Sequence, residues 1–498
     1  MMQCRPDRAP KSLFRILESK HEQIPPDAGA TCSPHDCGAP SNAMTAMTRM
    51  QSEGRRELRD LIVLAVPVVL SELGWMAQGV VDNIMVGRLG PEAIGAVSLG
   101  NAVFYTPSLF GIGLLLGLDT LVAQAYGRRD HDECHRWLAQ GVYLAFIITP
   151  PLMLLIAAIS FGFARFGVTP SVAAPASSYL RILAWSTLPL LLYGGIRRYL
   201  QAVGQVRVIT LTYVLANLLN WGGNWVLIYG KLGFPALGVD GSAISTCVAR
   251  VAMAVTLLGF AWRYERSRGH PLFRHWAAPQ WDRLRTLVRI GAPAAGQILL
   301  EVGAWNLSTF AASYLNPVAL ATHAIALNYA SISYMVPLGV SAAAAVSVGH
   351  AIGAGNPARA RRAGWLALGL GTSFMILAGI VFLVAPRALI ALYTSDPRVL
   401  AVGPSLLWIA AAFQIFDGIQ TVCTGALRGL GKTRAPMVAN FVGYWILGLP
   451  LGLTLCFVLH WGIYGMWLGL TLALVVISSS LLMRWRIESN RAALVIHP

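Results

Sequence analysis

The chain has 498 residues, of which 56% are hydrophobic and only 12% are charged, whereas soluble domains carry roughly 25% charged residues. The hydrophobic fraction excludes a soluble fold, because no soluble core could bury that much apolar surface. The net charge of +16 would by itself suit a nucleic-acid-binding protein, but the positions of the basic residues, described below, exclude nucleic acid as a partner.

The first 57 residues are polar and contain no apolar run of signal-peptide length. We expect residues 1–57 to form a disordered cytoplasmic tail. Met44, Met47 and Met50 within it are each candidates for the true translation start. The first apolar run must therefore direct insertion into the membrane.

Apolar runs of roughly twenty residues or more follow the tail, separated by short segments that hold Gly, Pro, Arg and Asp. A helix of that length crosses about 30 Å of hydrocarbon, and the alternating ten-residue segments typical of an outer-membrane barrel are absent. The sequence therefore predicts an all-α integral membrane protein with twelve transmembrane helices. The predicted spans are residues 60–84, 93–118, 137–160, 172–196, 208–229, 241–262, 285–311, 318–346, 363–384, 399–424, 436–458 and 462–484.

The basic residues are distributed unevenly between alternate loops. With a cytoplasmic N-terminus, 31 of the 38 fall in cytoplasmic segments, five in outside segments and two, Arg181 and Arg250, within spans. Such a bias follows the positive-inside rule. It predicts a multi-pass membrane protein with both termini cytoplasmic. We expect this protein in the plasma membrane, the inner membrane of a bacterium. It also accounts for the basic charge without nucleic acid.

The sequence matches itself at an offset of 226 residues without a gap, and the offset drifts to 227 where Leu200 lies over Leu427. The chain is therefore a tandem duplication. The matched pairs at the first offset are Pro67 with Pro293, Pro91 with Pro317, Gly113 with Gly339, Gly127 with Gly353, and Arg136 with Arg362.

Each repeat holds an even number of spans, so both halves enter the membrane from the same side as parallel repeats. We expect two six-helix bundles, residues 58–262 and 284–486, around a central cavity. A cytoplasmic linker, residues 263–283, joins them, and residues 487–498 form a cytoplasmic tail. Two halves that rock around a solute pathway are the usual use of such symmetry; a duplication kept only for stability is the alternative.

Four acids lie deep in the predicted spans, where a charge costs at least ~2.5–3.5 kcal/mol on insertion scales. Each acid therefore needs a partner, a water-filled cavity or a function. Three of them break the repeat symmetry. The acids are Glu72, Asp82, Glu301 and Asp417, and the positions equivalent to the last three hold Ser308, Trp75 and Leu190.

A carboxylate in a low-dielectric cavity can exchange a proton near neutral pH, or ligate Na⁺ together with other oxygens. We expect Asp82, Glu301 and Asp417 to bind the coupling ion, with Na⁺ placed at Glu301 and Asp417. Helix-to-helix hydrogen bonds are the alternative for Asp82 and Asp417. Glu72 is a candidate cavity residue, and it could equally face another side of its helix.

Amides and aromatics complete the candidate cavity. Asn217, Asn220 and Asn224 recur at spacings of three and four on one helical stripe, which can line a cavity or hold helices together. We expect Asn220 and Asn224 to line it. Trp305, Tyr329 and Phe413 are candidates for cation–π contacts with organic cations, although aromatics also serve as ordinary packing residues.

Several motifs together resemble one family. The first predicted span ends Val81-Asp82-Asn-Ile-Met-Val-Gly87, the second ends in Asp119 to Gly127, and the tenth leads into Gly425-Ala-Leu-Arg-Gly-Leu-Gly431. With the segment from Asn224 to Gly241, these resemble the multidrug and toxic compound extrusion (MATE) family in its NorM-like branch. The resemblance covers roughly residues 58–486.

The resemblance implies an antiporter that exports cationic amphiphilic compounds in exchange for H⁺ or Na⁺ by alternating access. It places family acids at Asp82, Glu301 and Asp417 and paired amides at Asn220 and Asn224, while Glu72 has no counterpart. A flippase for a lipid-linked precursor, which would want basic cavity residues, is the alternative. A membrane-embedded enzyme or receptor is a second alternative, from a different class.

The remaining expectations concern partners. The seven cysteines show no CxxC pair and no Cys/His cluster, so we expect no structural disulfide and no structural metal. We expect a monomer that is not an enzyme, with small organic cations and the lipid bilayer as partners, and with no cofactor apart from the coupling ion.

Overall fold

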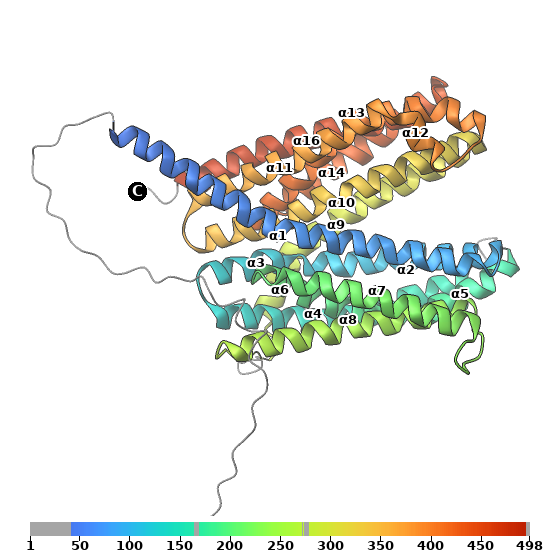
Figure 1. Cartoon of the computed structure of the whole chain (residues 1–498), viewed down its shortest axis with the longest axis horizontal. Coiled ribbons are helices and arrows are strands. Elements are labelled where there is room, and N and C mark those ends of the chain that lie inside the picture. Colours follow the sequence, from blue (N-terminus) through green and yellow to red (C-terminus); the bar gives the residue numbers. More distant parts are fainter. Residues whose placement is uncertain (1–40, 164–168, 271, 273–277, 495–498) are drawn as a thin grey trace, which may run out of the picture. The chain divides into compact units, whose positions relative to one another are not determined.

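The computed structural model describes residues 41–163, 169–270, 272 and 278–494. The chain divides into two units, Met1–Glu53 and Gly54–Pro498, and the fold below is that of the second. Every regular element of the described residues is a helix (Figure 1). The elements are α1 (Ser41–Gly87), α2 (Pro91–Leu115), α3 (Gly117–Gly127), α4 (His131–Gly162), α5 (Pro170–Ala184), α6 (Thr187–Ala202), α7 (Val206–Tyr229), α8 (Val239–Ser267), α9 (Trp281–Ser313), α10 (Pro317–Gly353), α11 (Pro357–Val384), α12 (Pro386–Ala391), α13 (Pro397–Gly429), α14 (Arg434–Asn440), the π-helix η1 (Phe441–Gly448), α15 (Leu449–Leu453), the π-helix η2 (Thr454–Val458) and α16 (Gly462–Leu494).

Part of each predicted terminal tail is helical. Helix α1 begins at Ser41, inside the tail expected to be disordered, and α16 continues to Leu494. The first helix extends because the residues just before its apolar run, such as Arg55 and Glu57, favour a helix and include no proline. The remaining tail residues, 1–40 and 495–498, and part of the predicted linker lie outside the described residues.

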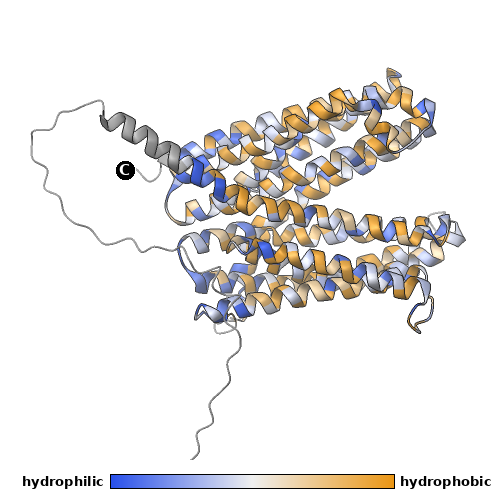
Figure 2. Ribbon diagram, viewed as in Figure 1, coloured by the Kyte–Doolittle hydropathy of each residue, from blue (hydrophilic) through white to orange (hydrophobic). Residues whose placement is uncertain are grey.

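The apolar helices agree with the predicted spans. Ten helices of the described part are long and apolar enough to cross a membrane, and the bent pair of α5 and α6 supplies an eleventh. The 24-residue α7 occupies the fifth predicted span; its three asparagines lower its hydropathy, and it is not among the ten. Figure 2 shows the hydrophobic colour along most of the helices.

The predicted span 172–196 is broken, contrary to the single helix expected. Helices α5 and α6 meet at Trp185 and Ser186 with a bend of 47°. The Ser186 hydroxyl donates a hydrogen bond to the carbonyl oxygen of Leu183 at 2.6 Å, and Arg250 donates to the same hydroxyl at 2.6 Å. A hydroxyl bonded back to its own helix is a common cause of a bend, and here an arginine from α8 contacts that hydroxyl.

Two large hydrophobic clusters form most of the core, one in the N-lobe (α1–α8) and one in the C-lobe (α9–α16). The first helix of each lobe also packs on the other lobe. Leu61 and Ala65 of α1 are buried in the C-lobe cluster, while Leu284 and Leu287 of α9 are buried in the N-lobe cluster. Leu61 and Leu287 are equivalent at the 226-residue offset, so the two halves exchange the beginnings of their first helices symmetrically.

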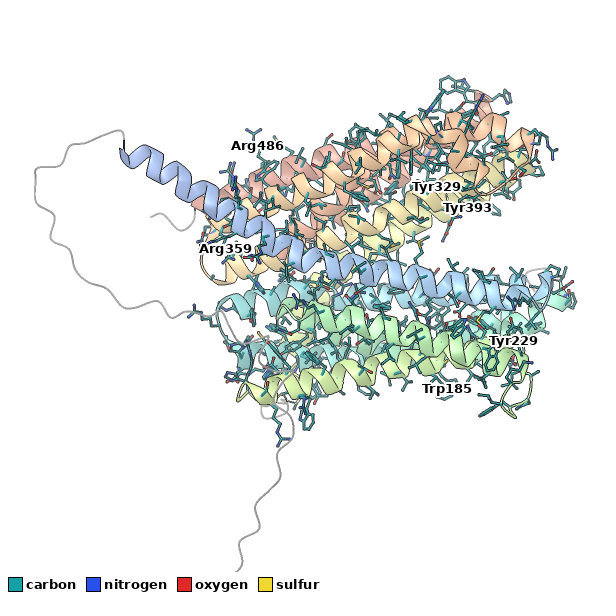
Figure 3. All side chains as sticks on the ribbon, in the orientation of Figure 1. Trp185, Tyr229, Tyr329, Arg359, Tyr393 and Arg486 are labelled. Atoms are coloured by element: carbon teal, nitrogen blue, oxygen red, sulfur yellow. The ribbon has the colours of Figure 1, made fainter. Side chains whose placement is uncertain are left out.

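The loops that carry most of the arginines lie at one end of the helices, which we call the basic end. Figure 3 shows Arg359 and Arg486 at this end and Tyr229, Tyr329 and Tyr393 towards the opposite end. In Figure 1 the ribbons of the two lobes lie closest together at the basic end and diverge towards the opposite end.

Candidate functional site

A central cavity of about 600 Å³ lies between the lobes. It is lined by α1, α2 and α6 from the N-lobe and by α9, α10 and α13 from the C-lobe. Five of the sequence-predicted site residues line it, namely Glu72, Glu301, Trp305, Phe413 and Asp417. Most of the other lining side chains are apolar, which suits an amphiphilic ligand.

Glu301 and Asp417 bring two carboxylates to the C-lobe wall of this cavity. Glu301 accepts hydrogen bonds from the amides of Gln297 at 3.4 Å and Asn440 at 3.3 Å. Asn440 ends α14, where the π-helix η1 begins, and such irregular turns are frequent at functional sites. Amides can hold a carboxylate in place without cancelling its charge, so the pair can attract a proton, a metal cation or an organic cation.

Glu72 differs from that pair because it has a basic partner. Arg197 of α6 donates a hydrogen bond to its carboxylate, and the Arg197 side chain is only 3% exposed. The guanidinium also lies 5.9 Å from the ring centroid of Tyr213. Glu72 therefore lines the cavity as half of a buried ion pair, which leaves it little net attraction for a cation.

Asp82 lies in a separate, polar cavity of about 310 Å³ within the N-lobe. The amide of Asn224 donates to its Oδ1 at 2.6 Å, and the hydroxyl of Thr246 donates to its Oδ2 at 3.4 Å. Asn220 donates to Thr246 at 3.3 Å. Asn220 and Asn224 are fully buried and line neither cavity, so the expectation that they face a substrate cavity is not met. They position the carboxylate instead.

The aromatic candidates separate into two groups. Trp305 and Phe413 line the central cavity with their ring centroids 5.3 Å apart at an interplanar angle of 80°, backed by Trp467. Tyr329 does not line this cavity. Its hydroxyl donates to the carbonyl oxygen of Leu389 at 2.8 Å and its ring contacts Tyr393 (Figure 3). Tyr329 lies on α10, which also supplies residues to the cavity wall. Its position on that helix alone did not determine whether its side chain faces the cavity.

Several arginines at these sites were not assigned from the sequence. Arg250 lines the N-lobe cavity beside Asp82, with its guanidinium 4.6 Å from the ring centroid of Phe104. Its position within a predicted span was the available signal. Arg198 and Arg428 line the central cavity towards the basic end and both face Asp119, at 3.6 and 3.7 Å. Little in the sequence indicated that these two arginines line a cavity, because both come from segments predicted to be cytoplasmic loops.

Comparison with known sequences gives one family. The sequence profile described as MatE matches residues 67–226 and 293–454. The two matches begin 226 residues apart, which is the offset of the internal repeat. The family match therefore covers both halves in turn.

Curated relatives match over most of their length. The chain is 38% identical over 443 residues to a probable multidrug resistance protein NorM of Mesorhizobium japonicum, covering 86% of this chain and 94% of the relative. It is 35% identical over 452 residues to the multidrug resistance protein NorM of Burkholderia vietnamiensis, covering 89% of this chain and 96% of the relative.

Solved structures share the fold at lower identity. The crystal structure of the eukaryotic MATE transporter AtDTX14 matches with a TM-score of 0.79 at 23% identity, covering 89% of this chain and 99% of that one. An outward-facing multidrug resistance MATE family transporter matches with a TM-score of 0.79 at 19% identity, covering 88% and 97%. The predicted fold class, an all-α membrane fold of two parallel repeats, is confirmed.

Proposed function

Because the chain belongs to the MatE family, we propose that it is a multidrug exporter that moves cationic amphiphilic compounds out of the cell in exchange for H⁺ or Na⁺. The relatives that match most of the chain are named multidrug resistance proteins. The observation that carries the proposal is the pair of carboxylates, Glu301 and Asp417, in an otherwise largely apolar cavity between two lobes, with Glu301 held by the amides of Gln297 and Asn440.

Competition for one negative site couples the two cations. A drug cation and the coupling ion are attracted by the same carboxylates, so the binding of one disfavours the binding of the other. The faces of Trp305 and Phe413 add cation–π and apolar contact for the drug. An incoming H⁺ or Na⁺ at Glu301 and Asp417 therefore releases the drug.

The lobes supply alternating access. We place the basic end in the cytoplasm, following the positive-inside rule, with the chain as a monomer in the bacterial inner membrane. The cavity then opens to the outside when the lobes meet at the basic end, and to the cytoplasm when they separate there. No enzymatic step and no cofactor besides the coupling ion is needed.

The lipid-linked precursor flippase stays a second candidate because of one observation. Arg198 and Arg428 line the central cavity. Among the ion pairs of the described residues, both guanidinium groups share a single acid within 4.0 Å, Asp119. Basic residues suit an anionic headgroup. The acid pair at Glu301 and Asp417 and the names of the relatives favour the exporter.

The test is ion-driven efflux of ethidium from proteoliposomes that contain the purified protein. We expect an imposed pH gradient or an imposed Na⁺ gradient to accelerate efflux at least several-fold over liposomes without a gradient, and the effective gradient identifies the coupling ion. Protein-free liposomes and a collapsed gradient are the controls. Well-folded protein that exports no organic cation, and instead scrambles a fluorescent anionic lipid, would overturn the exporter in favour of the flippase.

Asp82 should act on coupling without touching the drug, because its cavity is separate from the central one. We expect Asp82→Asn to bind ethidium within about twofold of wild type while gradient-driven efflux falls roughly tenfold, as one proton-binding carboxylate is lost. Fluorescence titration and proteoliposome efflux measure the two quantities. Binding weakened as much as efflux would place Asp82 in the drug site and contradict this role.

A further inference from the structure

At the basic end, one side chain from each lobe is hydrogen-bonded to a backbone carbonyl of the opposite lobe. Gln124 of α3 donates its amide to the carbonyl oxygen of Gly429 on α13 at 3.0 Å. His350 of α10 is hydrogen-bonded through Nε2 to the carbonyl oxygen of Ala202 on α6 at 2.6 Å. The first bond runs from the N-lobe to the C-lobe and the second runs back. We call Gln124, Gly127, His350 and Gly353, with these two acceptors, the basic-end clasp.

The clasp follows the internal repeat. Gln124 and His350 are equivalent at the 226-residue offset, and Ala202 and Gly429 are equivalent at the 227-residue offset that applies later in each half. The two hydrogen bonds are therefore copies of one contact, made once by a glutamine and once by a histidine. Such a copy in both halves is expected of a device that opens along the symmetry axis between the lobes.

Two glycines allow the backbones to meet at the clasp. A Cβ added at Gly127 would overlap the carbonyl oxygen of His350, and one added at Gly353 would overlap the carbonyl oxygen of Gln124. These overlaps are with backbone atoms of the opposite lobe, so no side-chain rearrangement relieves them. The pairing is again reciprocal, because Gly127 and Gly353 are equivalent in the repeat.

The clasp lies directly beyond the central cavity. Arg428, the neighbour of the acceptor Gly429, lines the cavity, and Arg198 lines it one helical turn before the acceptor Ala202. The hydroxyl of Thr120 donates to the carbonyl oxygen of Arg428 at 2.5 Å, which adds a third bond between the lobes. The clasp therefore separates the cavity from the basic end.

We propose that the basic-end clasp is the gate whose closure holds the cavity shut towards the basic end, and that Gln124 and His350 set the balance between the two open forms. They are positioning residues, since neither contacts the central cavity. The proposal rests on the proposed function only for its use in transport. A gate equilibrium exists whether or not organic cations are exported.

The experiment measures the gate without drug or ion gradient. Spin labels at Arg207→Cys and Arg361→Cys, exposed residues of the two lobes near the basic end, report its opening by pulsed electron resonance. Labels at Lys231→Cys and Arg387→Cys report the opposite end. The chain carries serine at its native cysteines and is held in lipid nanodiscs.

Removal of one clasp hydrogen bond, in Gln124→Ala or His350→Ala, should raise the ratio of basic-end-open to basic-end-closed molecules roughly fivefold, since one net hydrogen bond is worth about that factor. Gly127→Ala and Gly353→Ala should shift the distances further, because in the closed form the added Cβ would overlap the backbone of the opposite lobe. The opposite-end distances should shorten in the same samples.

Two matched controls separate a gate from general damage. His350→Gln copies the residue of the equivalent position and should keep the wild-type distances. Gly369→Ala, a helical glycine with open space around it, should also leave them unchanged. Folded alanine variants of Gln124 and His350 with wild-type distance distributions would overturn the proposal. So would a shift in Gly369→Ala as large as that in Gly353→Ala.

Discussion

Glu301→Gln and Asp417→Asn should each reduce ion-driven ethidium efflux by at least tenfold, towards the rate of protein-free liposomes. Each change removes one charge from the C-lobe wall of the central cavity and keeps nearly the same shape. Without that charge the site loses attraction both for the drug and for the coupling ion, and a loss of one charge-assisted contact is worth about 1.5–3 kcal/mol. Ethidium titration should show weaker binding in both variants.

The control for these two variants is an acid far from the cavity. Asp396→Asn removes a carboxylate that is hydrogen-bonded to Arg398 at the beginning of α13, so efflux and binding should stay at wild-type values. Wild-type rates of gradient-driven efflux in both Glu301→Gln and Asp417→Asn would show that these carboxylates do not couple transport. Unlike the gate distances, this outcome bears directly on the proposed function.

Arg197→Met should destabilise the protein by about 3–5 kcal/mol, since it leaves the Glu72 carboxylate buried without its counter-charge. The measurement is the apparent melting temperature in detergent, followed by tryptophan fluorescence, and a drop of several degrees is expected. The double variant Glu72→Gln with Arg197→Met removes both charges and should recover most of the loss, because replacing a buried pair with uncharged residues is often neutral.

An exposed pair provides the comparison. Arg398→Met breaks an ion pair whose arginine side chain is 77% exposed, and exposed pairs contribute little to stability, so its melting temperature should match wild type. The stable double variant should also keep ion-driven efflux, which would show that the Glu72 carboxylate is not needed for coupling. A single variant Arg197→Met that melts like wild type would contradict a stabilising role for the pair.

The sequence by itself determined the membrane class, the duplication and the asymmetric acids. Apolar runs of membrane length are local features, so composition along the chain locates them. A tandem repeat leaves equivalent residues at a constant offset, such as Gly127 and Gly353. An acid such as Asp417 can be recognised from the sequence as a functional candidate, because a charge inside an apolar run is costly to insert into the membrane.

Only the tertiary structure decided which partner each acid has. Glu72 meets Arg197, 125 residues away, and Asp82 meets Asn224, 142 residues away. Helical periodicity tells which residues share a face and leaves open which helix that face meets. For the same reason the position of Tyr329 outside the central cavity did not follow from its sequence.

The exchange of first helices between the lobes was likewise a tertiary result. Leu61 and Leu287 are apolar residues at the beginnings of equivalent spans, and either lobe could have buried them. In the structure Leu287 packs against Gly117 of the N-lobe, where an added Cβ would overlap it, and Leu61 is buried in the C-lobe cluster. Apolar burial has no direction of its own, so the sequence could locate these residues but not the lobe that buries them.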